Sequence, residues 1–151
     1  MAPVVNVFKK DSINFKTLVA VTAQHREMLD QVLSVFDIIP DYDLDLMSKS
    51  QTLEGLTGKI LNGISRLLIQ IQPDLIFVQG DTTSTFSASL AAFYQKIPVC
   101  HVEAGLRTRN IYSPFPEEIN RRMTSSIASF HFPPTKQAHQ NLLNEGVEDD
   151  N

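Results

Sequence analysis

The sequence lacks several features that define particular classes of protein. It contains no tryptophan and a single cysteine, Cys100, which cannot form a disulfide within the chain. A lone cysteine inside an apolar run is typical of a reducing compartment, so we expect a cytoplasmic protein. No apolar run approaches about 18 residues and the first residues lack a signal-peptide pattern, so we expect a soluble protein with no membrane partner.

The 151 residues also lack any block of charge of one sign. The net charge is −4, and acidic and basic residues are interspersed. Because nucleic-acid binding needs a concentrated basic surface, we do not expect a nucleic-acid partner. The motifs GxSxG, GxxxxGK[ST] and GxGxxG are absent, and the histidines show no metal-ligand spacing. We therefore expect no metal and no cofactor.

Strand-like and helix-like segments alternate throughout the chain. Short β-branched or apolar runs predict strands, and apolar residues three and four apart predict helices. Alternation with these lengths favours an α/β fold, in which a parallel sheet is covered by helices on both faces. The predicted strands are residues 17–22, 41–47, 75–79, 97–102 and 129–132, and the predicted helices are 26–36, 52–71, 83–95, a helix opening near Glu117, and 135–145.

Two carboxylates follow predicted strands directly, where ligands bind in parallel sheets. Asp81 lies in "QGDTTSTF", where it could present a carboxylate beside the hydroxyl of Thr82; the alternative is ordinary N-capping of the next helix. Glu103 ends "IPVCHV"; the alternative is a structural ion pair with Arg107 or Arg109. Both interpretations stay open for each carboxylate.

A third segment carries two acids, Glu117 and Glu118, which follow Pro116 at a helix start, where acids also complement the helix dipole. Arg121 and Arg122 lie four residues further on and could form ordinary helix ion pairs. If the acids of three separate segments converge on one sheet edge near arginines, they suit proton abstraction and donation on a polar, anionic substrate.

Four longer stretches carry a family resemblance. "VTAQHREMLDQVL", "GDTTSTFSASLAAFYQKIPVCHVEAGLRT", "YSPFPEEINRRMT" and "HFPPTKQAHQNLL" resemble the bacterial non-hydrolysing UDP-N-acetylglucosamine 2-epimerases over nearly the whole chain. The resemblance implies a Rossmann-like, doubly wound sheet that forms the N-terminal half of a glycosyltransferase-B-like fold. It also implies an isomerase that interconverts UDP-GlcNAc and UDP-ManNAc through 2-acetamidoglucal.

The resemblance assigns roles to individual residues. Asp81, Glu103 and Glu117 match the catalytic carboxylates of the family: Asp81 and Glu117 would handle the C2 proton, and Glu103 would stabilise the oxocarbenium-like sugar. Thr82 and Arg107 are expected to contact substrate or effector. The stretch "QHRE" is expected to line a second, activating UDP-GlcNAc site near Glu117; its residues are Gln24, His25, Arg26 and Glu27.

The resemblance also covers only part of the family's length. "MAPVV" matches the interior of the family's first helix, so we expect a single domain truncated at both ends, without the first strand and the C-terminal nucleotide-binding domain. Because that strand is central in such a sheet, we expect the isolated chain to be marginally stable or to need a second copy or a complete epimerase chain. Two alternatives remain: a hydrolysing epimerase that releases ManNAc, and a non-catalytic fragment or interaction module.

Overall fold

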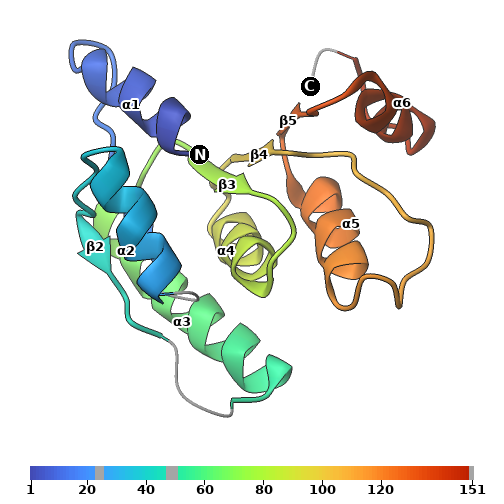
Figure 1. Cartoon of the computed structure of the whole chain (residues 1–151), viewed down its shortest axis with the longest axis horizontal. Coiled ribbons are helices and arrows are strands. Elements are labelled where there is room, and N and C mark those ends of the chain that lie inside the picture. Colours follow the sequence, from blue (N-terminus) through green and yellow to red (C-terminus); the bar gives the residue numbers. More distant parts are fainter. Residues whose placement is uncertain (23–25, 47–50, 150–151) are drawn as a thin grey trace. The chain divides into compact units, whose positions relative to one another are not determined.

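The structure, a computed structural model, describes residues 1–22, 26–46 and 51–149, which form two compact units (Figure 1). Every described strand pair is parallel, and strands alternate with helices, as the sequence predicts. The single sheet that we expected is present as two sheets, one in each unit. No helix in the described part of the chain is long and apolar enough to cross a membrane.

The first unit, residues 1–51, is a small α/β layer. Helix α1 (Ala2–Lys10) and helix α2 (Arg26–Val35) accompany two short parallel strands, β1 (Ala20–Val21) and β2 (Tyr42–Asp43). The predicted strand at 17–22 is reduced to two residues, of which only Val21 is buried. Asn6 donates a hydrogen bond to the carbonyl of Phe36, which ties α1 to the end of α2.

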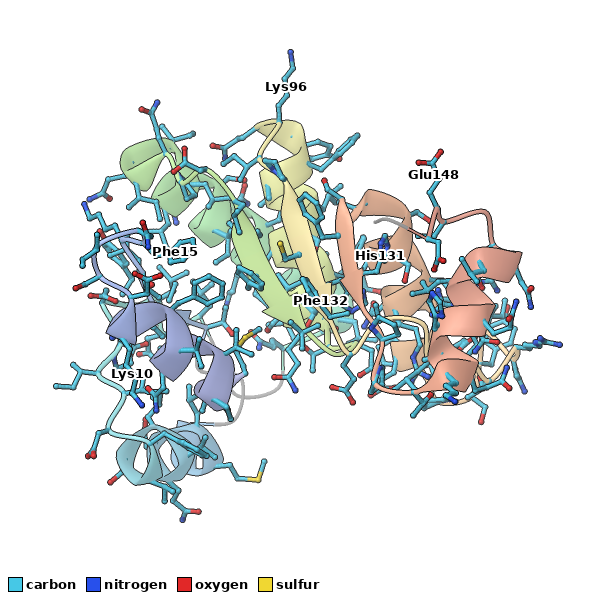
Figure 2. All side chains as sticks on the ribbon, turned by 90° about the horizontal axis from the view of Figure 1, so that it is seen from above. Lys10, Phe15, Lys96, His131, Phe132 and Glu148 are labelled. Carbon is cyan, nitrogen blue, oxygen red and sulfur yellow. The ribbon has the colours of Figure 1, made fainter. Side chains whose placement is uncertain are left out.

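The second unit, residues 52–151, contains a three-stranded parallel sheet in the order β3-β4-β5. Figure 2 shows these strands side by side, with Phe132 on β5. The strands are joined by helices in sequence order, as in a βαβ arrangement. The elements are α3 (Leu53–Ile71), β3 (Ile76–Gln79), α4 (Thr83–Tyr94), β4 (Val99–Val102), α5 (Glu117–Ile127), β5 (Phe130–Phe132) and α6 (Lys136–Asn144).

Helix α4 is the centre of this unit, because it packs against both α3 and α5 and against strands β3 and β4. Its buried positions carry small side chains, including Ser87, Ser89, Ala91 and Ala92, which let the neighbouring helices approach closely. The larger core side chains come from α3, where Ile60 is fully buried. The sequence predicts α3 from apolar residues at helical spacing, and in the structure Thr52 caps this helix by accepting from the N–H of Gly55.

Helix α6 is held against the segment that follows β4. Gly105 has φ +85°, and its backbone lies so close to α6 that an added Cβ would clash with the backbone of Ala138. Asn141 donates a 2.9 Å hydrogen bond to the carbonyl of Gly105. The glycine therefore serves a close approach as well as a left-handed turn.

We predict that Gly105→Ala destabilises the chain by about 2–4 kcal/mol, because the new methyl group forces the loop and α6 apart at a backbone angle that disfavours side chains. Gly146→Ala is the matched control: Gly146 has φ +87°, but nothing lies within 4 Å of an added Cβ. We expect it to cost only about 1 kcal/mol. Urea unfolding of both variants measures the difference, and equal costs would contradict the packing explanation.

Candidate active site at the carboxyl ends of β3 and β4

Asp81 lies in the turn between β3 and α4. The cap of α4 is Thr82, whose hydroxyl accepts from the N–H of Thr85 at 3.2 Å. N-capping therefore explains Thr82 and leaves the carboxylate of Asp81 free of that role. The Thr85 hydroxyl donates to the carbonyl of Gln79 at 2.7 Å, so the end of β3 and the start of α4 are fixed together.

The carboxylate of Asp81 is bound by α5. Its Oδ2 lies 2.6 Å from an Nη of Arg121, and the amide of Asn120 donates to the Asp81 main-chain carbonyl at 3.0 Å. Both the backbone and the side chain of Asp81 are thus held by one helix. The carboxylate remains about a quarter exposed, since its relative exposure is 27%.

Glu103 follows β4 directly and lies beside the Asp81 turn. Gln79 and Val102 are register partners on β3 and β4, so the two strands end at the same edge of the sheet. The Nε2 of Gln79 donates to Oε2 of Glu103 at 3.3 Å. Glu103 has φ +69°, a left-handed backbone that costs about 1–2 kcal/mol for a residue with a side chain. Strain of this kind gathers at functional sites.

The structural alternative for Glu103, an ion pair with Arg107 or Arg109, is not found among the residues that the structure describes. Arg107 forms a two-pronged pair with Glu145, with both N···O distances 2.8 Å, and also donates to Ser125. Its side chain is buried, and these contacts fasten the loop after β4 to α5 and α6. A substrate or effector contact of Arg107 stays a prediction.

Glu117 and Glu118 have different environments although they are neighbours in α5. Glu118 is fully buried and accepts from the backbone N–H groups of Thr108 and Arg109 at 3.0 and 3.1 Å. Glu117 is half-buried, and its carboxylate makes no hydrogen bond or ion pair to the residues that the structure describes. It lies one helical turn before Arg121, on the helix that binds Asp81.

Helix α5 buries its polar side. The buried positions are all polar or charged, while the apolar side chains of Ile119, Met123 and Ile127 are only half-buried. Amphipathic helices usually face the core with their apolar side. The polar residues that α5 turns inward are Glu118, Asn120, Arg121, Thr124 and Ser125.

Burial alone would raise the pKa of Glu118, but its hydrogen bonds from Thr108 and Arg109 and the charge of Arg121 outweigh burial. The pKa of Glu118 is therefore below its ordinary value of 4.5. Glu118 is a carboxylate at neutral pH, and its charge is compensated within the protein.

His101 supports the Asp81 turn from β4. It is fully buried, and its Nε2 lies 2.8 Å from the carbonyl of Gly80. Burial lowers the pKa of His101 below its ordinary value of 6.5, so at neutral pH the ring is uncharged and donates from Nε2.

The sequence-predicted site residues fall into three groups. The structure brings Asp81 and Glu103 to one sheet edge and places Glu117 on the helix that binds Asp81. Arg26 and Glu27 begin α2 in the first unit, whereas Gln24 and His25 lie outside the described residues. No three His, Cys, Asp or Glu side chains are grouped for metal binding within the described ranges.

Sequence reasoning missed the supporting residues Glu118, Asn120 and Arg121. From the sequence, Arg121 and Arg122 could form ordinary i,i+4 helix ion pairs, but in the structure Arg121 pairs with Glu118 at i,i+3 and with Asp81 forty residues earlier. The signal that could have found them is the spacing of the small polar residues Thr124 and Ser125, which continue the same helix face.

We predict that Glu118→Gln lowers the free energy of unfolding by about 2–4 kcal/mol at pH 7, because one buried N–H loses its acceptor and Arg121 loses a partner. Since folding lowers the pKa of Glu118, the unfolded chain takes up its proton first. The stabilisation is therefore complete above pH 4.5 and declines as the pH falls below that value.

Urea unfolding of both proteins between pH 7 and pH 3 measures this difference, which should shrink at the acid end. Glu117→Gln is the control, with an expected cost at pH 7 under about 0.5 kcal/mol. A wild-type advantage that stays constant down to pH 3 would refute the assignment.

The chain is similar to known proteins over nearly its whole length. A family model described as UDP-N-acetylglucosamine 2-epimerase matches residues 7–151. The chain is 55% identical over 150 residues to the UDP-N-acetylglucosamine 2-epimerase of Salmonella typhimurium, and 56% identical over 149 residues to that of Escherichia coli K12. Each match covers 99% of this chain but only 40% and 39% of the respective relative.

A solved structure gives the same result. The crystal structure of the UDP-GlcNAc 2-epimerase from Neisseria meningitidis bound to UDP-GlcNAc is 53% identical, with a TM-score of 0.95. The match covers 99% of this chain and 40% of that one, and it confirms the Rossmann-like α/β fold. The chain belongs to the UDP-N-acetylglucosamine 2-epimerase family and corresponds to its N-terminal domain.

Proposed function

We propose that this chain carries the carboxylate half of the active site of a non-hydrolysing epimerase, an isomerase that interconverts UDP-GlcNAc and UDP-ManNAc. The observation that carries the proposal is the placement of Asp81 and Glu103 at one sheet edge. There, Nε2 of Gln79 donates to Oε2 of Glu103 at 3.3 Å. Family membership supplies the substrate class, since the Neisseria meningitidis relative is bound to UDP-GlcNAc.

The reaction inverts C2 of the sugar, and the carboxylates suit each step. The C1–O bond breaks with its electron pair leaving on UDP, and the C2 proton passes to a carboxylate as the C1=C2 double bond of 2-acetamidoglucal forms. Protonation of C2 on the other face and return of UDP to C1 give the epimer. Two proton carriers are required, and we assign them to Asp81 and Glu117.

Glu103 has a different task in this proposal. Positive charge develops at C1 and the ring oxygen as UDP departs, and a fixed carboxylate nearby stabilises that charge without moving. The backbone of Glu103 is anchored by its N–H, which donates to the carbonyl of Phe132 at 3.0 Å. Its carboxylate accepts from Nε2 of Gln79 at 3.3 Å, which holds it at the sheet edge.

The chain spans about 40% of the curated relatives that it matches. We infer that residues 1–151 act as a single N-terminal domain, and that in the relatives most contacts to the uridine and pyrophosphate come from the part that this chain does not match. The other candidate is a non-catalytic module that associates with a second copy or with a complete epimerase.

Incubation of the chain at high concentration with UDP-GlcNAc in D₂O, followed by ¹H NMR, tests the proposal. We expect UDP-ManNAc with deuterium at C2, because the proton carriers exchange with solvent. Free ManNAc and UDP would instead indicate a hydrolysing enzyme. Unchanged UDP-GlcNAc would contradict turnover by this chain and support the non-catalytic module.

Substitution of the proton carriers gives a sharper result. Asp81→Asn and Glu117→Gln should each lower the rate of C2 deuterium incorporation by about 10²–10⁴-fold, the usual contribution of an acid–base group. Asp74→Asn is the matched control, because Asp74 is an exposed carboxylate just before β3, at the opposite end of that strand. Equal rates for Asp81→Asn and Asp74→Asn would exclude Asp81 as a proton carrier.

The strained backbone of Glu103 yields a separate prediction. Glycine adopts positive φ without steric cost, whereas alanine does not. We expect the free energy of unfolding of Glu103→Gly to be about 1 kcal/mol higher than that of Glu103→Ala. Both variants should lose turnover. Thermal unfolding compares the two variants; an alanine variant at least as stable as the glycine variant would contradict functional strain.

A further inference from the structure

Arg121 joins the Asp81 carboxylate to the loop that connects the other two candidate carboxylates. One Nη of Arg121 lies 2.6 Å from Oδ2 of Asp81, and the other lies 3.6 Å from Oε2 of Glu118. Glu118 in turn holds the N–H groups of Thr108 and Arg109. That loop begins at Glu103 and ends at Glu117, so a single guanidinium links all three segments.

Stability does not explain why Glu118 and Arg121 are both buried. Glu118 is 0% exposed and Arg121 is 9% exposed. A buried ion pair recovers at best about what its desolvation costs, and apolar replacements of similar volume are often as stable. The same helix leaves Ile119 half-exposed while it buries these charges. A role in placing another group accounts for the arrangement better than a gain in stability.

The contacts of Asp81 show which group is placed. Its carbonyl is held by Asn120 and its Oδ2 by Arg121. Its Oδ1 forms no hydrogen bond or ion pair with any described residue. One carboxylate oxygen is thus anchored and the other is left for a ligand. The two Nη atoms of a planar guanidinium can contact Asp81 and Glu118 at the same time. A lysine ammonium cannot contact both carboxylates with the same geometry.

We propose that Arg121 is a positioning residue for epimerisation: it anchors Oδ2 of Asp81 so that Oδ1 faces the sugar, and Glu118 holds Arg121 in that orientation. The inference rests on the proposed function for the identity of the sugar. The anchoring of Asp81 concerns this chain alone and is measured without substrate.

The test compares Arg121→Gln, Arg121→Lys and Arg122→Gln. Arg122 is exposed and adjacent, so its variant controls for loss of one positive charge from α5. Three-bond NMR couplings to Cγ of Asp81 report its χ1 rotamer. We expect one rotamer in the wild type and in Arg122→Gln, averaging over rotamers in Arg121→Gln, and an intermediate result in Arg121→Lys. Amide exchange at Thr108 and Arg109 should quicken about tenfold or more in Arg121→Gln.

Activity gives the second readout. With UDP-GlcNAc in D₂O, Arg121→Gln should lower kcat for C2 exchange about 10²-fold with KM changed less than about threefold, and Arg121→Lys should recover part of the loss. An Asp81 rotamer that stays fixed in Arg121→Gln overturns the proposal. If Arg121→Gln does not fold, a wild-type rotamer distribution in Arg121→Lys overturns it instead. If the wild type shows no C2 exchange, the proposed function fails, while the rotamer comparison still decides the role of Arg121.

Discussion

The ion pair between Arg121 and Asp81 is the contact on which the candidate site depends. It joins two residues forty positions apart and brings α5 against the turn that follows β3. Because Arg121 also contacts Glu118, and Glu118 binds two loop N–H groups, the same pair fixes the segment between Glu103 and Glu117. Without it, Glu118 would be the only charged partner that the described residues give to the buried Arg121.

The rest of the second unit supports this contact from both sides. The small side chains of α4 let α5 approach closely, and His101 holds the carbonyl of Gly80 just before Asp81. On the other side, Gly105 packs against α6, and Arg107 pairs with Glu145 at the C-terminal end of α6. These contacts hold the two ends of the loop, so the carboxylates that follow β3 and β4 stay at one sheet edge.

The sequence predicts the elements well because their patterns are local. Apolar spacing and the Thr52 cap define α3, and short β-branched runs before acidic turns locate β3 and β4. The predictions fail where a tertiary contact overrides the local rule. Residues 17–22 form only a two-residue strand because one partner and one buried side chain support them. Glu118 and Arg121 follow helix-surface rules in sequence, yet both are buried, since their partners Thr108 and Asp81 are distant in the chain.

We propose that the Asp81 carboxylate, anchored by Arg121, contacts C2 of a nucleotide sugar. The most direct measurement is a crystal structure of the chain with bound UDP-GlcNAc. We predict that C2 lies about 3–3.5 Å from Oδ1 of Asp81, the range of a reactive contact, while Oδ2 stays paired with Arg121. A sugar bound away from β3 and β4, or an Asp81 carboxylate turned away from it, would contradict the account.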